Sequence, residues 1–147
     1  KTVCDEVAVI NNGQLIEKGS IAEIFSHPTQ ELTKQFIASS LHLQLPFDYQ
    51  VRLKETCIEG ENIIVRIDIT GKSDANALLS EIARLYNINS NIICAQMDNV
   101  GGVKFGAMII ELIDAKEKGR DALAFMESRN VKLEVLGYVA SNDRTVD

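Results

Sequence analysis

The order of apolar periodicities in residues 61–139 constrains the fold more than any other feature. Apolar and polar residues alternate at 63–70 and 131–137, and this period of two predicts half-buried strands there. Two mostly apolar segments at 92–100 and 103–113, separated by the Gly101-Gly102 turn, predict two further strands. Helical spacing of apolar residues predicts two helices, one after Ser73 or Asp74 with an apolar face from Ala75 to Tyr86, and one between Gly119 and Asn130. The order of elements is therefore βαββαβ.

This order predicts an α+β ferredoxin-like sandwich, with a four-stranded antiparallel sheet and two helices on one face. Right-handed crossovers place the first and third strands in the centre of the sheet and the second and fourth at its edges. The helix face is expected to include Leu85, and the second helix is expected to bury Met126.

The residues before this domain divide into two parts. Asn11-Asn12-Gly13 between two apolar runs predicts a hairpin, and Ser20 and Thr29 are expected to cap two helices that follow. Residues 1–40 thus form a small block, and because the chain begins at Lys1 we expect it to be part of a longer protein. Residues 41–60 are expected to be a linker with an edge strand near Val51, and residues 140–147 a disordered tail.

The second and third strands of the domain are apolar on both faces, from Ile92 to Met97 and from Phe105 to Leu112. Strands of this kind need cover on both sides. Two explanations stay open: association with a second copy, which we favour, or cover by residues 41–58 of the same chain.

Composition argues against several functions. The chain has 15 basic and 21 acidic side chains and a net charge of −6, which disfavours nucleic acid as a partner. No phosphate-binding loop, nucleophile elbow or catalytic constellation is present. Three widely spaced cysteines and two histidines do not form a metal motif. We therefore expect no catalytic residue and no metal site.

Two sets of motifs resemble known sequences. The first resembles the NIL domain, an ACT-like regulatory module of the ATPase subunit of bacterial methionine ABC importers, and consists of Asn91–Asp98, Gly101–Gly106 and Val135–Val139. The second resembles the closing stretch of an importer ATPase domain and consists of Val3–Ile10, Gly13, Ile16–Gly19 and Phe25–Pro28. The resemblance divides the chain into the end of an ATPase domain at 1–40, the linker, and a NIL domain at 61–139.

The chain departs from an ATPase by lacking the Walker A lysine, the signature loop, the Walker B acid and the switch histidine. His27 precedes Pro28 and does not match the switch position. The resemblance therefore implies no enzyme activity and no cofactor for this chain, whereas ATP and magnesium belong to the ATPase domain of the parent.

The resemblance also implies a function. A NIL domain binds cytoplasmic L-methionine and favours an arrangement that stops uptake, which is transinhibition, and the parent works with transmembrane permease subunits at the cytoplasmic face of the bacterial inner membrane. Methionine must then bind the inhibited arrangement more tightly than the active one. The alternative is a dimerisation module that binds no ligand.

The ligand is expected at a homodimer interface formed by the strand from Asn91 to Val100, which is an apolar edge. Antiparallel pairing about Ala95 would bring Asn91 of one chain near Asp98 and the Gly101-Gly102 turn of the other. The amide of Asn91 and the carboxylate of Asp98 suit the zwitterion, and the glycines allow close approach. The expected contacts of the thioether tail are Ile92, Met97, Val103 and Phe105.

Overall fold

The computed structural model of the protein describes residues 5–40, 43–58, 60–71, 73–100 and 102–141. Its main feature is an antiparallel sheet of four strands in the order β4-β5-β3-β6. The strands are β3 (Asn62–Ile69), β4 (Asn89–Val100), β5 (Val103–Ile113) and β6 (Lys132–Val139). The expected fold is confirmed, because the first and third strands of the domain are central and the second and fourth are at the edges.

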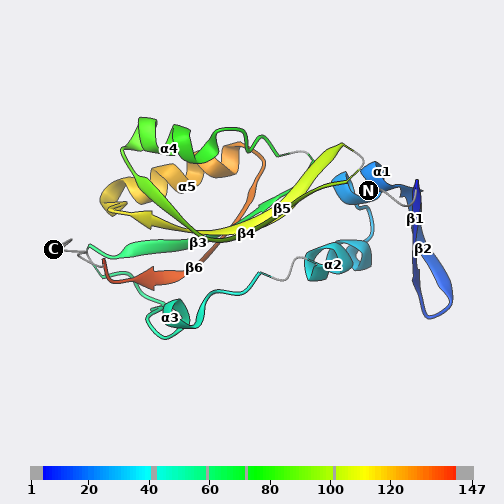
Figure 1. Ribbon diagram of the computed structural model, residues 1–147, viewed down its shortest axis with the longest axis horizontal. Helices are drawn as coiled ribbons and strands as arrows, with labels where there is room; N and C mark the ends of the chain where they lie inside the picture. The colour runs from blue at the N-terminus through cyan, green and yellow to red at the C-terminus, as the bar shows by residue number, and fades with distance from the viewer. Residues whose placement is uncertain (1–4, 41–42, 59, 72, 101, 142–147) are drawn as a thin grey trace.

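Two helices, α4 (Leu78–Tyr86) and α5 (Gly119–Ser128), cover one face of this sheet (Figure 1), and a short 3-10 turn (Lys116–Lys118) precedes α5. The largest cluster of buried side chains lies between the helices and the sheet, and includes Ile67, Ile82, Ile110 and Met126. Burial of this layer supplies most of the hydrophobic stabilisation. No helix in the described ranges has the length and apolar character required to cross a membrane.

Two expectations for α4 are wrong. The residue before the helix is Ala77 in a left-handed conformation, and no side chain caps the helix there. Ser73 instead fixes the preceding turn, because its hydroxyl accepts a bond from the Thr70 N–H at 2.9 Å and donates to the Asn130 carbonyl at 2.7 Å. Leu85 is 62% exposed and not buried, because the helix packs through a narrower face than its sequence suggests.

The second face of the sheet is covered by residues 43–58, which we call the strap. The strap contains a single turn of helix, α3 (Phe47–Gln50), and passes on the side of the sheet away from α4 and α5 (Figure 1). Its side chains Leu43, Leu45, Tyr49 and Leu53 pack against a second cluster formed by Ile64, Ile109 and Val139. Cover of this face by the same chain, the less favoured explanation, is therefore correct.

The strap meets β6 at one point. The expected edge strand near Val51 is reduced to a bridge between Lys54 and Tyr138, which exchange two backbone hydrogen bonds of 2.8 Å. Gly137 has a φ of +153°, and a Cβ there would lie 2.6 Å from the Lys54 carbonyl oxygen and 2.8 Å from the Leu53 side chain. Only glycine allows the strap to come this close.

The first block contains the expected hairpin, formed by β1 (Glu6–Asn11) and β2 (Gln14–Ser20). Asn12 and Gly13 in its turn both have positive φ, as a tight hairpin turn requires. Ser20 caps α1 (Ile21–Ser26) in a capping box with Glu23, which confirms the expected cap.

The start of α2 (Glu31–Ser40) differs from expectation, because Thr29 donates its hydroxyl to Glu17 of β2 at 2.7 Å. The same carboxylate accepts bonds from the backbone N–H groups of Thr29 at 2.9 Å and Gln30 at 3.2 Å. The hydroxyls of Thr33 and Thr29 and these N–H groups lower the pKa of Glu17 from 4.5 to about 2. A side chain from the hairpin, instead of Thr29, thus satisfies the free N–H groups before the helix.

The first block also contacts the sheet. The ring of Phe25 in α1 packs on the ring of Phe105 in β5, with centroids 4.7 Å apart. Figure 1 shows α1 beside the end of the long hairpin formed by β4 and β5. This aromatic pair joins the two parts of the chain.

Replacing Gly137 with alanine should lower the free energy of unfolding by about 1–3 kcal/mol, the usual range for a strained backbone position. The matched control is Gly60→Ala, because Gly60 has a φ of +88° and open space around it. Chemical denaturation measures both. The close contact with the strap is disproved if Gly137→Ala is no more destabilising than Gly60→Ala.

The pKa of Glu17 predicts a local acid transition. Because the folded pKa, about 2, lies below the ordinary 4.5, the contact stabilises the block above pH 4.5 and is lost as the pH falls through about 2. The amide shifts of Thr29 and Gln30 in NMR spectra should report this midpoint, and Glu17→Gln should abolish the transition. A midpoint near pH 4.5 would contradict the assigned contacts.

Candidate functional site

A β-bulge in the edge strand β4 decides which way the expected ligand contacts face. The register against β5 shifts between Ile92 and Cys94. Asn91 and Asp98 are an odd number of positions apart, so regular alternation would put them on opposite faces. Because the bulge adds one residue to β4, both instead pair with residues of β5, Glu111 and Phe105, that alternate in step with Ile109 and so share the face of the sheet on the side of the strap. The two polar candidates therefore share one face of the sheet.

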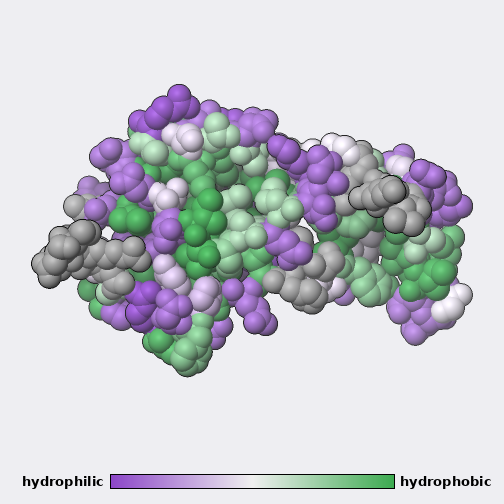
Figure 2. Space-filling model, viewed as in Figure 1, coloured by the Kyte–Doolittle hydropathy of each residue, from purple (hydrophilic) through white to green (hydrophobic). Residues whose placement is uncertain are grey.

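Two of the expected tail contacts lie on the other face. Ile92 pairs with Ile110 and Met97 pairs with Gly106, on the side of α4 and α5. Their side chains are 53% and 44% exposed. Figure 2 shows hydrophobic residues at the surface over the middle of the molecule, where β4 runs in Figure 1. The structure thus separates these apolar candidates from the polar ones.

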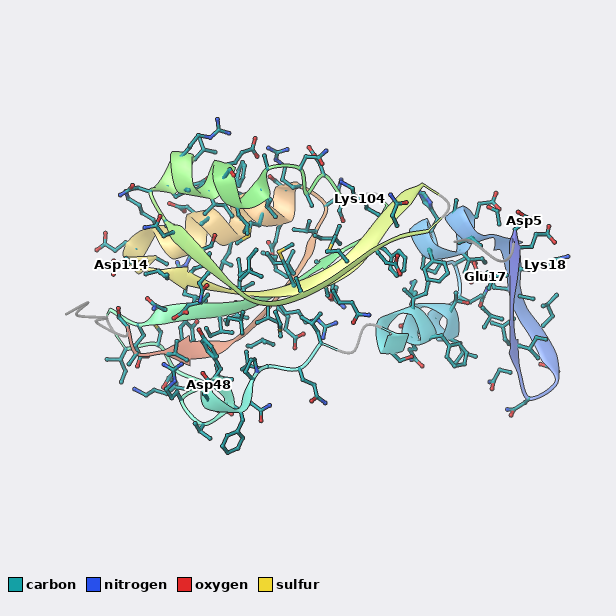
Figure 3. All side chains as sticks on the ribbon, viewed as in Figure 1. Asp5, Glu17, Lys18, Asp48, Lys104 and Asp114 are labelled. Atoms are coloured by element: carbon teal, nitrogen blue, oxygen red, sulfur yellow. The ribbon has the colours of Figure 1, made fainter. Side chains whose placement is uncertain are left out.

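The polar candidates also lie at opposite ends of the β4–β5 hairpin. Figure 3 shows the two ends, marked by Lys104 and Asp114. Asn91 lies toward the Asp114 end, whereas Asp98 and Gly102 lie toward the Lys104 end. At about 3.3 Å per residue, roughly 20 Å separates Asn91 from Asp98 along the strand. One chain alone does not bring them together.

The remaining expected contacts lie near the turn of the hairpin. Phe105 is buried against Phe25 of the first block. Val103 begins β5 opposite Val100, and Gly102 has a φ of +82° with open space around it. Gly101 lies outside the described residues.

At the Asn91 end, a buried carboxylate organises the strands and the strap. Glu111 is only 9% exposed. One of its oxygens accepts a bond from the Tyr49 hydroxyl at 3.0 Å, and the other accepts a bond from the Asn62 amide at 2.8 Å. The amide oxygen of Asn62 accepts the Asp114 N–H at 3.2 Å. These bonds join β3, β5 and α3 at one point.

Tyr49 extends this network to Asn91. Burial, followed by the hydrogen bond to the Glu111 carboxylate and its charge, raises the pKa of Tyr49 above 10.0. The Asn91 side chain and the Arg52 guanidinium act in the opposite sense on this pKa. The phenol therefore stays protonated at neutral pH and serves as a donor to Glu111.

A hollow of about 420 Å³ opens over this network between the strap and the sheet. Its size is typical of a small-ligand site. Arg52 stands at the hollow with its guanidinium 4.8 Å from the centre of the Tyr49 ring, and its Nε donates to the Asp48 carbonyl at 3.0 Å. The hollow is lined by Tyr49, Arg52, Asn62, Ser90, Asn91, Glu111, Ile113 and Ser141.

A second hollow of about 690 Å³ lies along the outer edge of β4 and is more open. It is lined by Leu43, Gln44, Cys94, Ala95 and Gln96. The Cys94 thiol donates to the Gln44 carbonyl at 3.6 Å, and burial raises its pKa. The thiol is therefore protonated and unreactive. Within the described ranges, no three His, Cys, Asp or Glu side chains gather as metal ligands.

The site predicted from the sequence lacks six polar residues that line the first hollow: Tyr49, Arg52, Asn62, Ser90, Glu111 and Ser141. The sequence could have indicated Glu111, because this residue interrupts an apolar strand that is buried on both faces, and a charged group in such a strand needs hydrogen-bond partners. No sequence pattern indicated Tyr49 or Arg52, because they belong to the segment predicted to be a linker.

Comparisons with known proteins agree with the resemblance of the motifs. Residues 63–135 match the NIL domain family. Methionine import ATP-binding protein MetN 1 of Salmonella typhimurium is 50% identical over 139 residues, which is 95% of this chain and 40% of the relative. MetN 3 of Pectobacterium atrosepticum is 48% identical and MetN of Vibrio cholerae is 45% identical, with the same coverage. The chain therefore spans about two fifths of these relatives.

A solved structure is also similar. It is the C-terminal domain of an ABC transporter ATP-binding protein from Enterococcus faecalis, with a TM-score of 0.48 and 23% sequence identity. The match covers 54% of this chain and 86% of that structure.

Proposed function

Because the chain belongs to the NIL-domain family, we propose that it is the methionine-sensing regulatory part of a methionine importer. The parent protein would be the ATP-binding subunit, would use ATP and magnesium, and would sit with permease subunits at the cytoplasmic face of the inner membrane. The observation that carries this proposal is the near-complete match of the chain to methionine import ATP-binding proteins. The polar hollow at Asn91 supports the proposal, because its volume and polar lining suit a small charged ligand.

The proposal includes a homodimer through β4. The two edges of the sheet differ, because β6 exchanges backbone hydrogen bonds with the strap at Lys54, whereas β4 pairs only with β5 among the described residues. The free edge of β4 also carries the exposed side chains of Ile92 and Met97. An apolar edge with unpaired backbone groups favours pairing with another strand.

The dimer would complete the ligand site. Antiparallel pairing about Ala95 brings Asn91 of one chain close to Asp98 and Gly102 of the other, over the polar hollow. The bulge supports this arrangement, because it turns Asn91 and Asp98 toward the same face. Methionine would then contact both chains, with Asn91 bonded to its charged head group.

Transinhibition would follow because methionine binding is thermodynamically coupled to the arrangement of the two regulatory domains. If methionine needs both chains for its site, then it binds the arrangement in which the two regulatory domains are paired correctly. That arrangement gains population as the internal methionine concentration rises. Uptake stops when the favoured arrangement keeps the two ATPase domains apart.

The second candidate function is a dimerisation module that binds no ligand. The exposed apolar edge of β4 favours it independently of the hollow. The two functions differ in one measurable property, because only the sensor binds methionine.

Asn91→Ala should weaken L-methionine binding roughly 5- to 150-fold, because a charged ligand group that loses its partner costs about 1–3 kcal/mol. Titration calorimetry on the full chain measures the affinity. Asn11→Ala, an exposed asparagine of the first hairpin, is the matched control and should bind normally. Wild-type affinity in Asn91→Ala would remove Asn91 from the site, and no binding by the wild type would leave the dimerisation module.

Ile92→Lys should dissociate the dimer, because a lysine on an edge strand opposes pairing with a second copy. The monomer should keep its fold, since the side chain is half exposed. Sedimentation velocity at micromolar concentration separates the two states. Leu85→Lys places the same charge at an exposed position on α4 and should stay dimeric. A monomeric wild type would disprove the interface.

A further inference from the structure

We propose that the hollow between α3 and β4 holds the head group of an amino-acid ligand, with Arg52 pairing its carboxylate and Glu111 its ammonium. This inference rests on the proposed function and deepens it. It adds the strap to a site that the sequence places only on β4 and β5, and it assigns each charge of the zwitterion to a residue.

Glu111 presents a buried carboxylate to the hollow. The carboxylate is nine-tenths buried, and the two donors that contact it are the neutral groups of Tyr49 and Asn62. No lysine or arginine in the described part of the chain forms an ion pair with it. A buried charge without an opposite charge is costly, so an ammonium group from a ligand would be bound favourably.

The geometry of Glu111 leaves room for that ammonium. A carboxylate has about four positions for hydrogen-bond donors. Tyr49 uses one position on one oxygen, and Asn62 uses one position on the other. Each oxygen therefore keeps capacity for a further donor, and the two existing bonds hold the carboxylate in a fixed orientation before the ligand arrives. Such preorganisation lowers the cost of binding.

Arg52 of the strap lines the same hollow. Its planar group lies over the Tyr49 ring at 4.8 Å, and Nε is anchored to the Asp48 carbonyl. The contact with the Asp48 carboxylate is long, 3.8 Å, and that carboxylate is exposed. Other N–H groups of the guanidinium are therefore available at the hollow, where they suit a carboxylate in two-point contact.

The two charges lie in one hollow with Asn91. Asn91 and Ser90 come from β4, Glu111 from β5 and Arg52 from the strap. A ligand with one positive and one negative group matches this arrangement, and Ile113 supplies an apolar wall beside it. A bound amino acid would tie α3 to the sheet. Since the strap follows the first block in the chain, occupancy of the site would also change how firmly the block is held.

The test uses ligands that each lack one charge. L-methioninamide has no carboxylate and N-acetyl-L-methionine has no ammonium. On the full chain, Arg52→Gln should weaken L-methionine about tenfold or more and leave the affinity for L-methioninamide within about twofold. Glu111→Gln should weaken L-methionine similarly and leave that for N-acetyl-L-methionine nearly unchanged. Arg84→Gln, at an exposed position in the last turn of α4, is the matched control.

A second measurement covers the case in which Glu111→Gln does not fold or a modified ligand binds too weakly. In wild-type protein, the Arg52 Nε–H resonance should shift when L-methionine is added, and the Arg84 resonance should not. The inference is overturned if Arg52→Gln weakens L-methionine and L-methioninamide equally, or if the Arg52 resonance does not move. If the wild type binds and only Asn91→Ala weakens binding, the inference fails and the proposed function stands. If the wild type does not bind L-methionine, both fail.

Discussion

The two central strands of the sheet are apolar on both faces, and the rest of the structure depends on how those faces are covered. Ile67 and Ile110 face α4 and α5, whereas Ile64 and Ile109 face the strap. A sheet with one uncovered apolar face would expose the second cluster to water. The strap therefore does more than connect two parts of the chain, because it completes the core.

The cover of the second face also creates the polar site. The strap reaches the sheet near the ends of β3 and β5, where Glu111 is buried and requires donors. Tyr49 supplies one donor from α3, and the same turn of helix places Arg52 beside the hollow. The contacts that stabilise this end of the sheet thus also line the proposed ligand site. A ligand at this site would act directly on the segment that leads to the first block, which is a simple physical route from sensing to regulation.

The order of the strands could be predicted from the sequence, because β3 and β6 alternate apolar and polar residues, β4 and β5 are apolar runs on either side of a glycine turn, and the helices have clear apolar faces. It did not predict the bulge, because Ile92, Ile93 and Cys94 are all apolar and no glycine marks the irregularity. It did not predict α3 either, because a single turn of helix after Pro46 is too short to show a period. These two features determine most of the candidate site. Asn91 could be identified from a motif, but the bulge decides which face of the sheet Asp98 lies on, and α3 brings Arg52 to the hollow.

We propose that one amino acid binds at Asn91 and that a second chain completes its site. A crystal structure of the chain grown with L-methionine tests this most directly. Our account predicts a dimer paired through β4, with methionine beside Asn91 of one chain and Asp98 of the other, and its head group in the hollow between α3 and the sheet. Methionine bound elsewhere, or a dimer that leaves the edge of β4 in water, would contradict it.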